Sequence, residues 1–93
     1  MKLAWAATAI ADRVEIYDYI EAENPSAAIQ MDERFVRSAE RLSRHPEMGR
    51  PGRVPSTREL VAHRHYFLLY QLTGDTVLIL AVVHTARRWP AIT

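Results

Sequence analysis

Residues 57–84, TRELVAHRHYFLLYQLTGDTVLILAVVH, decide the fold of this 93-residue chain. They contain three runs rich in Val, Leu, Tyr and Phe, residue types that favour strands. The runs are residues 58–62, 66–72 and 77–84. Thr73-Gly74-Asp75, between the second and third runs, is typical of a hairpin turn. The pattern therefore predicts three consecutive strands joined by tight turns, the first turn lying near residues 63–65.

The third run is continuously apolar from Val77 to Val83. Strands that are buried on both faces carry such runs, whereas half-exposed strands alternate polar and apolar residues. We therefore expect the last strand to lie inside the sheet and to be covered on both faces.

The first half of the chain predicts one short strand and two helices. Residues 2–6 resemble a strand, and the spacing of Ile10, Val14, Tyr17 and Ile20 predicts a helix over about residues 8–23, with Thr8 as a candidate N-cap. Asn24 and Pro25 together favour the start of a second helix, because asparagine caps a helix and proline suits its first position. Pro46 ends this helix after about residue 44. Residues 47–56, rich in proline and glycine, predict a loop.

The elements together predict an α+β fold in one domain over residues 1–93. Their order is β-α-α-β-β-β, and the short connection between the helices predicts an antiparallel hairpin. We expect this helical hairpin to pack on one face of a small, mostly antiparallel four-stranded sheet. The other face should be open, and concave because sheets twist.

Composition excludes several classes of protein. A hydrophobic content of 48% argues against disorder, and the lack of cysteine excludes disulfides and thiolate metal sites. No His, Asp and Glu spacing fits a metal site, and no cofactor motif is present, so we expect neither metal nor cofactor. No run has the length of a membrane span, and no signal peptide is recognisable, so we expect a cytoplasmic protein.

The net charge of +1 hides an uneven distribution. Residues 1–45 carry eight acids and six bases, whereas residues 46–93 carry three acids and six arginines. Arginine offers a planar, permanently charged group that matches phosphate and stacks on bases. The second half of the chain therefore favours a nucleic acid or nucleotide partner.

Several motifs occur together in an order that resembles the RelE/ParE superfamily, the toxins of bacterial type II toxin–antitoxin modules. These motifs are His45-Pro46-x-x-Gly49, Gly52-Arg53, Arg58-Glu59-Leu60, Tyr66-x-x-x-Tyr70 and residues 83–90, VHTARRWP. The resemblance covers essentially the whole chain. It implies a toxin that causes growth arrest and is neutralised by an antitoxin encoded beside it. RelE-like members cleave mRNA on the ribosome without metal, and ParE-like members inhibit DNA gyrase.

Metal-free RNA cleavage needs a base for the 2′-OH, positive charge for the phosphate and an acid for the leaving oxygen. His84 ends a strand, where RelE-like relatives often place a catalytic histidine or basic residue. Arg58 matches their phosphate-contacting cation, and Arg87 lies close to His84 in the sequence. These three residues are the predicted catalytic set. The alternative for His84 is a residue that only caps the sheet edge.

Further residues are predicted to bind RNA. Two arginines lie in the glycine-bearing loop, three polar residues lie in the first turn of the sheet, and a tryptophan near the C-terminus could stack on a base. They are Arg50, Arg53, His63, Arg64, His65 and Trp89. Each has an alternative as a solvated loop or turn residue or, for Trp89, as an anchor of the C-terminal tail.

Three functions therefore remain open. The favoured one is a ribosome-dependent mRNA endonuclease, whose partners would be the ribosome and mRNA. A ParE-like gyrase inhibitor is the second, because Leu60 stands where some RelE-like relatives carry a second cation and Phe67 stands where many carry arginine. The third is a decayed toxin that retains only antitoxin binding.

Overall fold

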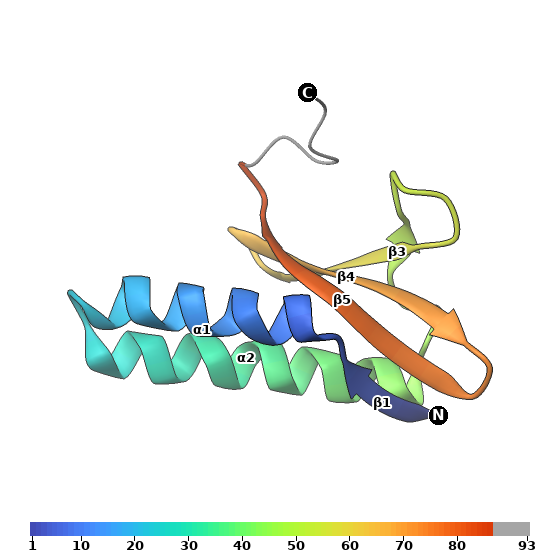
Figure 1. Ribbon diagram of the computed structural model, residues 1–93, viewed down its shortest axis with the longest axis horizontal. Helices are drawn as coiled ribbons and strands as arrows, with labels where there is room; N and C mark the ends of the chain where they lie inside the picture. Colours follow the sequence, from blue (N-terminus) through green and yellow to red (C-terminus); the bar gives the residue numbers. More distant parts are fainter. Residues whose placement is uncertain (87–93) are drawn as a thin grey trace.

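The computed structural model describes residues 1–86 and confirms the predicted α+β class and the order of the predicted elements (Figure 1). The helices and strands are β1 (Lys2–Trp5), α1 (Ala7–Glu21), α2 (Pro25–Arg44), β2 (Arg50–Pro51), β3 (Arg58–His63), β4 (Tyr66–Thr73) and β5 (Thr76–His84).

The strands form one mixed sheet in the order β1-β5-β4-β3-β2. β1 runs parallel to β5, and every other neighbouring pair is antiparallel. The sheet has five strands where the sequence predicted four, because Arg50 and Pro51 of the predicted loop pair with Glu59 and Arg58. A strand of two residues is too short to show an alternation of polar and apolar residues. Its proline is tolerated because β2 lies at the edge of the sheet.

Both helices pack on the same side of the sheet, as predicted, and lie side by side (Figure 1). Asn24 accepts a hydrogen bond from the Ala27 N–H, and Pro25 occupies the first turn of α2, which confirms the predicted helix start. Ala28, Phe35 and Leu42 of α2 are buried. The core between helices and sheet contains Ala9, Phe35, Ala39, Leu42, Leu60, Ala62, Tyr66, Leu68, Tyr70, Val77, Ile79 and Val82.

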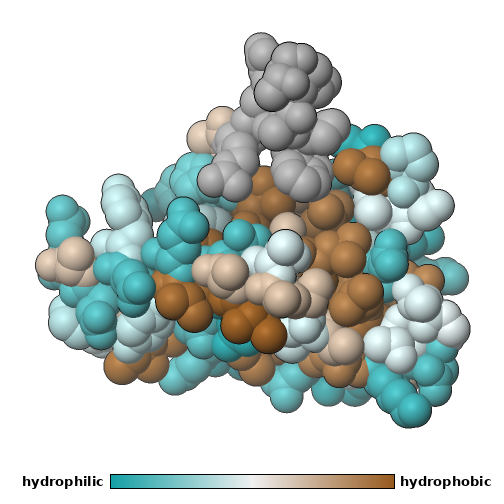
Figure 2. All heavy atoms as spheres, viewed as in Figure 1, coloured by the Kyte–Doolittle hydropathy of each residue, from teal (hydrophilic) through white to brown (hydrophobic). Residues whose placement is uncertain are grey.

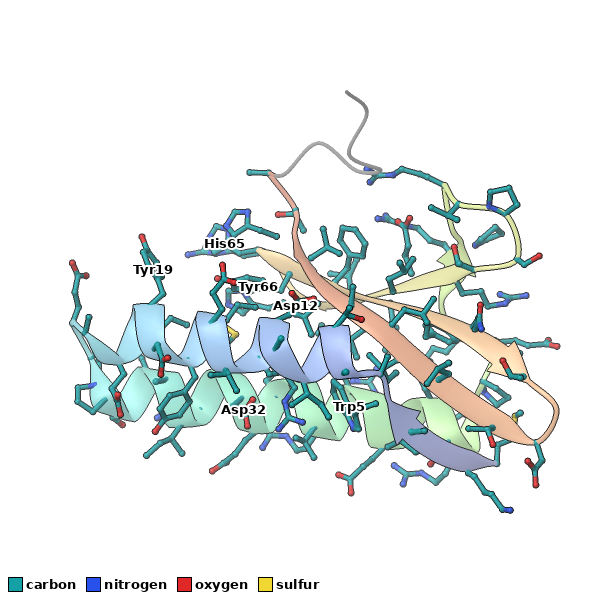
Figure 3. The ribbon with its side chains drawn as sticks, viewed as in Figure 1. Trp5, Asp12, Tyr19, Asp32, His65 and Tyr66 are labelled. Carbon is teal, nitrogen blue, oxygen red and sulfur yellow. The ribbon has the colours of Figure 1, made fainter. Side chains whose placement is uncertain are left out.

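An ion pair joins the two helices. Arg13 of α1 donates two hydrogen bonds to Asp32 of α2, of 2.9 and 2.8 Å, and its guanidinium lies 4.5 Å from the centre of the Trp5 ring (Figure 3). The pair is bidentate, a geometry that gives arginine–carboxylate contacts both energy and direction. It links α2 to α1 and to the end of β1.

β4, not β5, is the strand that is covered on both faces. Tyr66 to Tyr70 of β4 are all buried, whereas Leu78, Leu80 and Ala81 of β5 are only half-buried. β5 does lie inside the sheet, between β1 and β4. The prediction of two covered faces for β5 is wrong. On the face opposite the helices, the covering side chains are Arg50 of β2 and Arg53 of the loop after it, and they lie over Phe67 of β4. Burial of Phe67 and Leu69 also means that this face is not fully open.

α1 is apolar around much of its circumference. Ala9 is its only fully buried residue, while Ile10 and Val14 are 49% and 56% exposed. Figure 2 shows apolar side chains along this helix and over the neighbouring sheet. Ala6 occupies the N-cap position predicted for Thr8, and the Thr8 hydroxyl instead donates to the Leu80 C=O of β5 at 2.6 Å. α1 is thus fastened to β5 at its first turn.

Over residues 1–86, neither helix combines the length and the apolar character that a membrane-spanning helix requires.

Candidate functional site

The structure places Arg58 and His84 at opposite ends of the sheet. Arg58 lies opposite Tyr70 of β4, and His84 lies opposite Tyr66 of the same strand. Four residues of an extended strand span about 13 Å, so the two side chains do not share one site. Arg87, the third member of the predicted catalytic set, and Trp89 lie outside the described residues.

Arg58 fastens the connection that follows α2. Its Nη1 donates to the C=O of Gly49 at 2.8 Å and to the C=O of Glu47 at 3.3 Å. The Tyr70 hydroxyl accepts from the Gly49 N–H at 2.9 Å and donates to the Pro46 C=O at 2.8 Å. Burial raises the pKa of Tyr70, so its hydroxyl stays protonated and can donate. Arg58 therefore has a structural role, in which its guanidinium donates hydrogen bonds to main-chain carbonyls.

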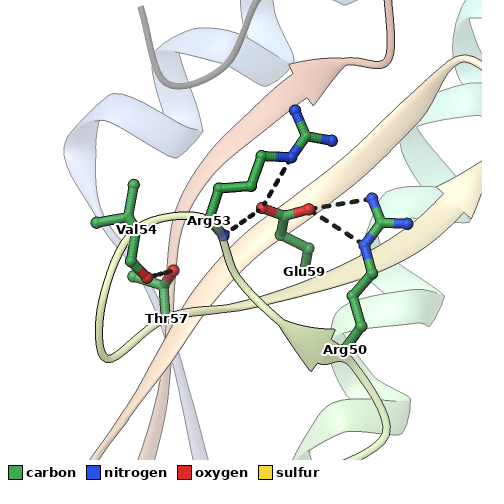
Figure 4. Close-up of polar contacts among 5 residues, drawn as sticks. All are labelled: Arg50, Arg53, Val54, Thr57 and Glu59. Atoms are coloured by element: carbon green, nitrogen blue, oxygen red, sulfur yellow. Dashed lines mark hydrogen bonds and ion pairs between the residues drawn. The ribbon is translucent and has the colours of Figure 1, made fainter.

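A buried carboxylate, Glu59, organises the two predicted RNA-binding arginines of the loop (Figure 4). Only 1% of its side chain is exposed. Its Oε1 accepts from Nε and Nη2 of Arg50, at 3.2 and 3.0 Å, and its Oε2 accepts from the Arg53 N–H at 3.1 Å. The Arg53 Nε lies 3.9 Å from the same oxygen. Glu59 therefore offsets much of the positive charge that the sequence assigns to this loop.

The same two arginines cover the Phe67 ring of β4. Their guanidinium carbons lie 6.0 Å (Arg50) and 5.8 Å (Arg53) from the ring centre. The loop closes through the Thr57 hydroxyl, which donates to the Val54 C=O at 2.6 Å. Arg50 and Arg53, held by Glu59, thus form a lid over the sheet face opposite the helices. Sequence reasoning gave Glu59 no role in the site, although it lies in a predicted strand, between Arg58 and Leu60.

The other predicted residues do come together, at the opposite end of β4. His63 and His84 lie beside Tyr66, and His65 lies beside both of these histidines; we call these four residues the histidine cluster. The ring centres of His63 and His65 lie 5.4 Å apart, and those of His65 and His84 lie 5.7 Å apart with planes inclined by 13°. Tyr66 meets His84 edge to face at 5.1 Å.

Main-chain contacts hold this end of the sheet together. The Thr85 N–H donates to the His65 C=O at 2.8 Å, and the Thr85 hydroxyl donates to the Arg64 C=O at 3.0 Å. The first sheet turn, with Arg64, is therefore tied to the segment that follows β5. The described residues contain no group of three or more His, Asp or Glu side chains that could hold a metal ion.

His63 should make folding stability depend on pH. Burial, the charge of Arg34 and the neighbouring His65 and Arg64 all lower the pKa of His63. Its Nδ1 also accepts from the His65 N–H at 3.2 Å, which requires the unprotonated atom.

The unfolded chain therefore binds a proton at this position more readily than the folded protein, and stability rises with pH. The contribution is complete above about pH 6.5, the ordinary histidine value, and is lost as the pH falls below it. Urea unfolding between pH 7.5 and 5 should show a shallower pH dependence for His63→Gln than for the unmodified protein. His45→Gln, outside the cluster, is the control, and equal slopes for both variants would contradict the prediction.

A groove lies between α1 and the end of β5, beside the histidine cluster. It encloses about 310 Å³ and is lined by Asp12, Glu15, Ile16, Tyr19, Tyr66, Val82 and His84. We call it the α1–β5 groove. Asp12 accepts a hydrogen bond from the Val82 N–H at 2.9 Å, and Tyr19, Tyr66 and Asp12 follow one another along it (Figure 3). Burial and the nearby Tyr19 raise the pKa of Tyr66, which remains a neutral phenol. Sequence reasoning missed this groove.

Comparison with known proteins agrees with this architecture. Residues 3–89 match the family model described as the ParE toxin of type II toxin–antitoxin system, parDE. The chain is 38% identical to the Sinorhizobium fredii protein Y4kP, over 98% of this chain and 95% of that protein. It is 35% identical to Toxin RelE2 of Caulobacter vibrioides, over 92% of this chain and 97% of that toxin.

A solved structure shares the fold. A chain of the chromosomal ParDE TA system from P. aeruginosa superposes with a TM-score of 0.82 and 27% identity, covering 90% of this chain and 95% of that one. The match of the family model and of both sequence relatives extends over nearly the whole chain. The protein therefore belongs to the ParE toxin family, within the RelE/ParE superfamily, and is a toxin of the type II toxin–antitoxin class.

Proposed function

We propose that this toxin arrests growth by binding DNA gyrase and that a cognate antitoxin neutralises it. One observation favours gyrase over mRNA: within residues 1–86, three of the arginines predicted to contact RNA, namely Arg50, Arg53 and Arg58, bind other groups of the fold. Arg58 donates to main-chain carbonyls, and Arg50 and Arg53 contact the buried Glu59. An inhibitor that acts by binding needs a rigid surface but no catalytic group.

The chemistry of RNA cleavage supports the same choice. A base and a cation that act on one phosphate must both lie within hydrogen-bond reach of it. Arg58 and His84 are separated by about 13 Å of strand. Some RelE-like relatives carry a cation at the position of Leu60, and many carry arginine at that of Phe67. Here the two side chains are 8% and 1% exposed. These two positions therefore contribute to packing and offer no positive charge to a phosphate.

A supercoiling assay tests the proposal. Purified gyrase and relaxed plasmid are incubated with increasing amounts of the toxin, and we expect supercoiling to be inhibited. His84→Ala should inhibit to within about twofold of the unmodified toxin, because no proton transfer is involved. Complete supercoiling at a large molar excess of folded toxin would contradict gyrase as the target. Toxin mixed beforehand with its cognate antitoxin is the control and should leave gyrase active.

The histidine cluster supports a second candidate, cleavage of mRNA on the ribosome. Imidazoles exchange protons near neutral pH, and three of them lie within 5.7 Å of a neighbour beside Arg64. In this function His84 would be the catalytic histidine, Arg87 the phosphate ligand, and His63, Arg64, His65 and Trp89 RNA contacts. Loss of cleavage in His84→Ala, with toxin folding unchanged, would favour this candidate over gyrase.

The antitoxin is part of the same proposal. The structure similar to this chain contains a ParDE toxin–antitoxin system, which supports an antitoxin encoded beside this toxin. We expect the antitoxin to fold on binding and to contribute a helix or an added strand. We expect this protein to act in the cytoplasm, because gyrase, mRNA and such an antitoxin all lie there.

A further inference from the structure

We propose that the histidine cluster is a proton-sensitive latch, which joins the turn between β3 and β4 to residues 85–86 near neutral pH and releases both segments in mild acid. The inference goes beyond the proposed function and holds whether gyrase or mRNA is the target. Three properties of the cluster carry it: two matching side-chain caps, a pair of bonds from Thr85, and an uneven distribution of charge.

Two histidines make the same local contact at the two ends of the latch. The His63 Nδ1 accepts from the His65 N–H at 3.2 Å, and the His84 Nδ1 accepts from the Ala86 N–H at 3.0 Å. Each side chain thus binds the N–H two residues later, as aspartate and asparagine do when they stabilise a turn. An imidazole accepts only through an unprotonated nitrogen, and an imidazolium has none. Protonation of the two rings therefore removes both caps.

Thr85 connects the two capped segments. Its N–H donates to the His65 C=O at 2.8 Å, and its hydroxyl donates to the Arg64 C=O at 3.0 Å. The His65 ring also stacks on that of His84, with ring centres 5.7 Å apart and planes inclined by 13°. Two protonated rings in this arrangement repel each other. Because the turn and residues 85–86 are bonded to each other, loosening of one segment also loosens the other.

The charges around His63 favour an open turn once this histidine is protonated. Burial lowers the pKa of His63, and the charges of Arg34, His65 and Arg64 lower it further. Arg34 of α2 is fixed near the turn, because its Nε donates to the Ala62 C=O at 2.6 Å. A protonated His63 therefore gains free energy when the turn opens and its ring moves into water.

The surroundings of His84 differ from those of His63. The α1–β5 groove brings two carboxylates and two phenols to this histidine, namely Asp12, Glu15, Tyr19 and Tyr66. A proton that enters at His84 thus meets carboxylates on α1, whereas one that enters at His63 meets arginines. The Tyr66 ring centre lies 6.4 Å from that of His63 and 5.1 Å from that of His84, and Tyr66 stays a neutral phenol. The histidines are therefore the groups of the cluster that change charge near neutral pH.

The sign of the pH dependence follows from the two caps. Both need an unprotonated Nδ1, so the latch is closed above about pH 6.5, the ordinary histidine value, and opens as the pH falls below it. Each proton that binds more readily to the open form favours opening by up to about tenfold per pH unit.

Amide exchange of the purified toxin, with each rate compared with the intrinsic rate of an unfolded chain at the same pH, tests the latch. The protection of the Thr85 and Ala86 N–H groups should fall at least about tenfold from about pH 7.5 to about pH 5.5. The Gly49 N–H, which donates to the Tyr70 hydroxyl at the opposite end of β4, is the internal control. Its protection should change by less than about threefold.

Asparagine separates the cap from the proton, because its side-chain oxygen accepts a hydrogen bond but does not titrate. His63→Asn/His84→Asn should therefore keep the protection of Thr85 and Ala86 at both pH values. His63→Ala/His84→Ala has no cap and should lose this protection at both. His45→Asn, outside the cluster, should retain the full fall in acid. Urea unfolding of each variant verifies that it folds.

Two results would overturn the inference. The first is protection of Thr85 and Ala86 that stays constant with pH in the unmodified toxin. The second is a fall of the same size in His63→Asn/His84→Asn, since the histidines would then not be its cause. Neither result bears on the choice between gyrase and mRNA, because the experiment contains the toxin alone.

Discussion

Glu59→Gln should lower the free energy of unfolding by about 2–4 kcal/mol, although the substitution changes only one atom. The side chain of Glu59 is almost fully buried and accepts hydrogen bonds from Arg50 and from the main chain of Arg53. A neutral amide loses the ion pairs, and its NH₂ group turns a donor toward donors. Both arginines are about half exposed and can recover water, so the loss stays below that of a wholly buried pair.

Equilibrium unfolding in urea measures this loss, and Glu47→Gln is the matched control. Glu47 is an exposed acid near the same loop, and its substitution should change stability by less than about 0.5 kcal/mol. The Glu59 variant should also show faster amide exchange in residues 50–57, because the lid is no longer held to the sheet. Equal stability of the two variants would show that Glu59 does not hold the lid.

Gly49→Ala should lower the free energy of unfolding by about 2–3 kcal/mol, because a side chain has no room there. A Cβ at this position would lie 2.6 Å from the Tyr70 hydroxyl oxygen, 2.7 Å from Cε1 of the same ring and 2.9 Å from the Glu59 C=O. Tyr70 is fully buried and hydrogen-bonded to both Gly49 and Pro46, so it cannot move away without breaking these bonds.

The control for this substitution is Gly74→Ala. A Cβ at Gly74 meets no atom within 4 Å, and the only cost is its backbone φ of 60°, which amounts to about 1 kcal/mol. Thermal or urea unfolding should therefore rank Gly49→Ala as the less stable variant. The reverse order would mean that the connection between α2 and β2 yields easily, and that Arg58 and Tyr70 do not fix it.

The elements that sequence predicts well are those with a local physical signal. The Asn24 cap and the turn at Gly74 both depend on near neighbours in the chain. β2 escaped prediction because two residues carry no alternation. The prediction that both faces of β5 are covered was wrong, because the covering of a strand depends on a loop that is distant in the sequence.

The candidate site was predicted only in part, for the same reason. Sequence identified the histidines and arginines, and the structure gathers His63, His65 and His84. The pairing of Arg58 with Tyr70, which separates it from His84, is set by strand register. The α1–β5 groove arises because β1 ends before β5 does, a property of the assembled sheet. The roles of Arg87 and Trp89 stay predictions.

Induction of this toxin alone in growing cells distinguishes inhibition of gyrase from cleavage of mRNA. One culture is divided for primer extension on a translated mRNA, with and without a ribosome inhibitor, and for the topology of a resident plasmid. Inhibition of gyrase predicts intact message and loss of negative supercoiling at the time of growth arrest, both unchanged in His84→Ala. Discrete new 5′ ends that require active translation and disappear in His84→Ala, with normal plasmid supercoiling, would contradict it.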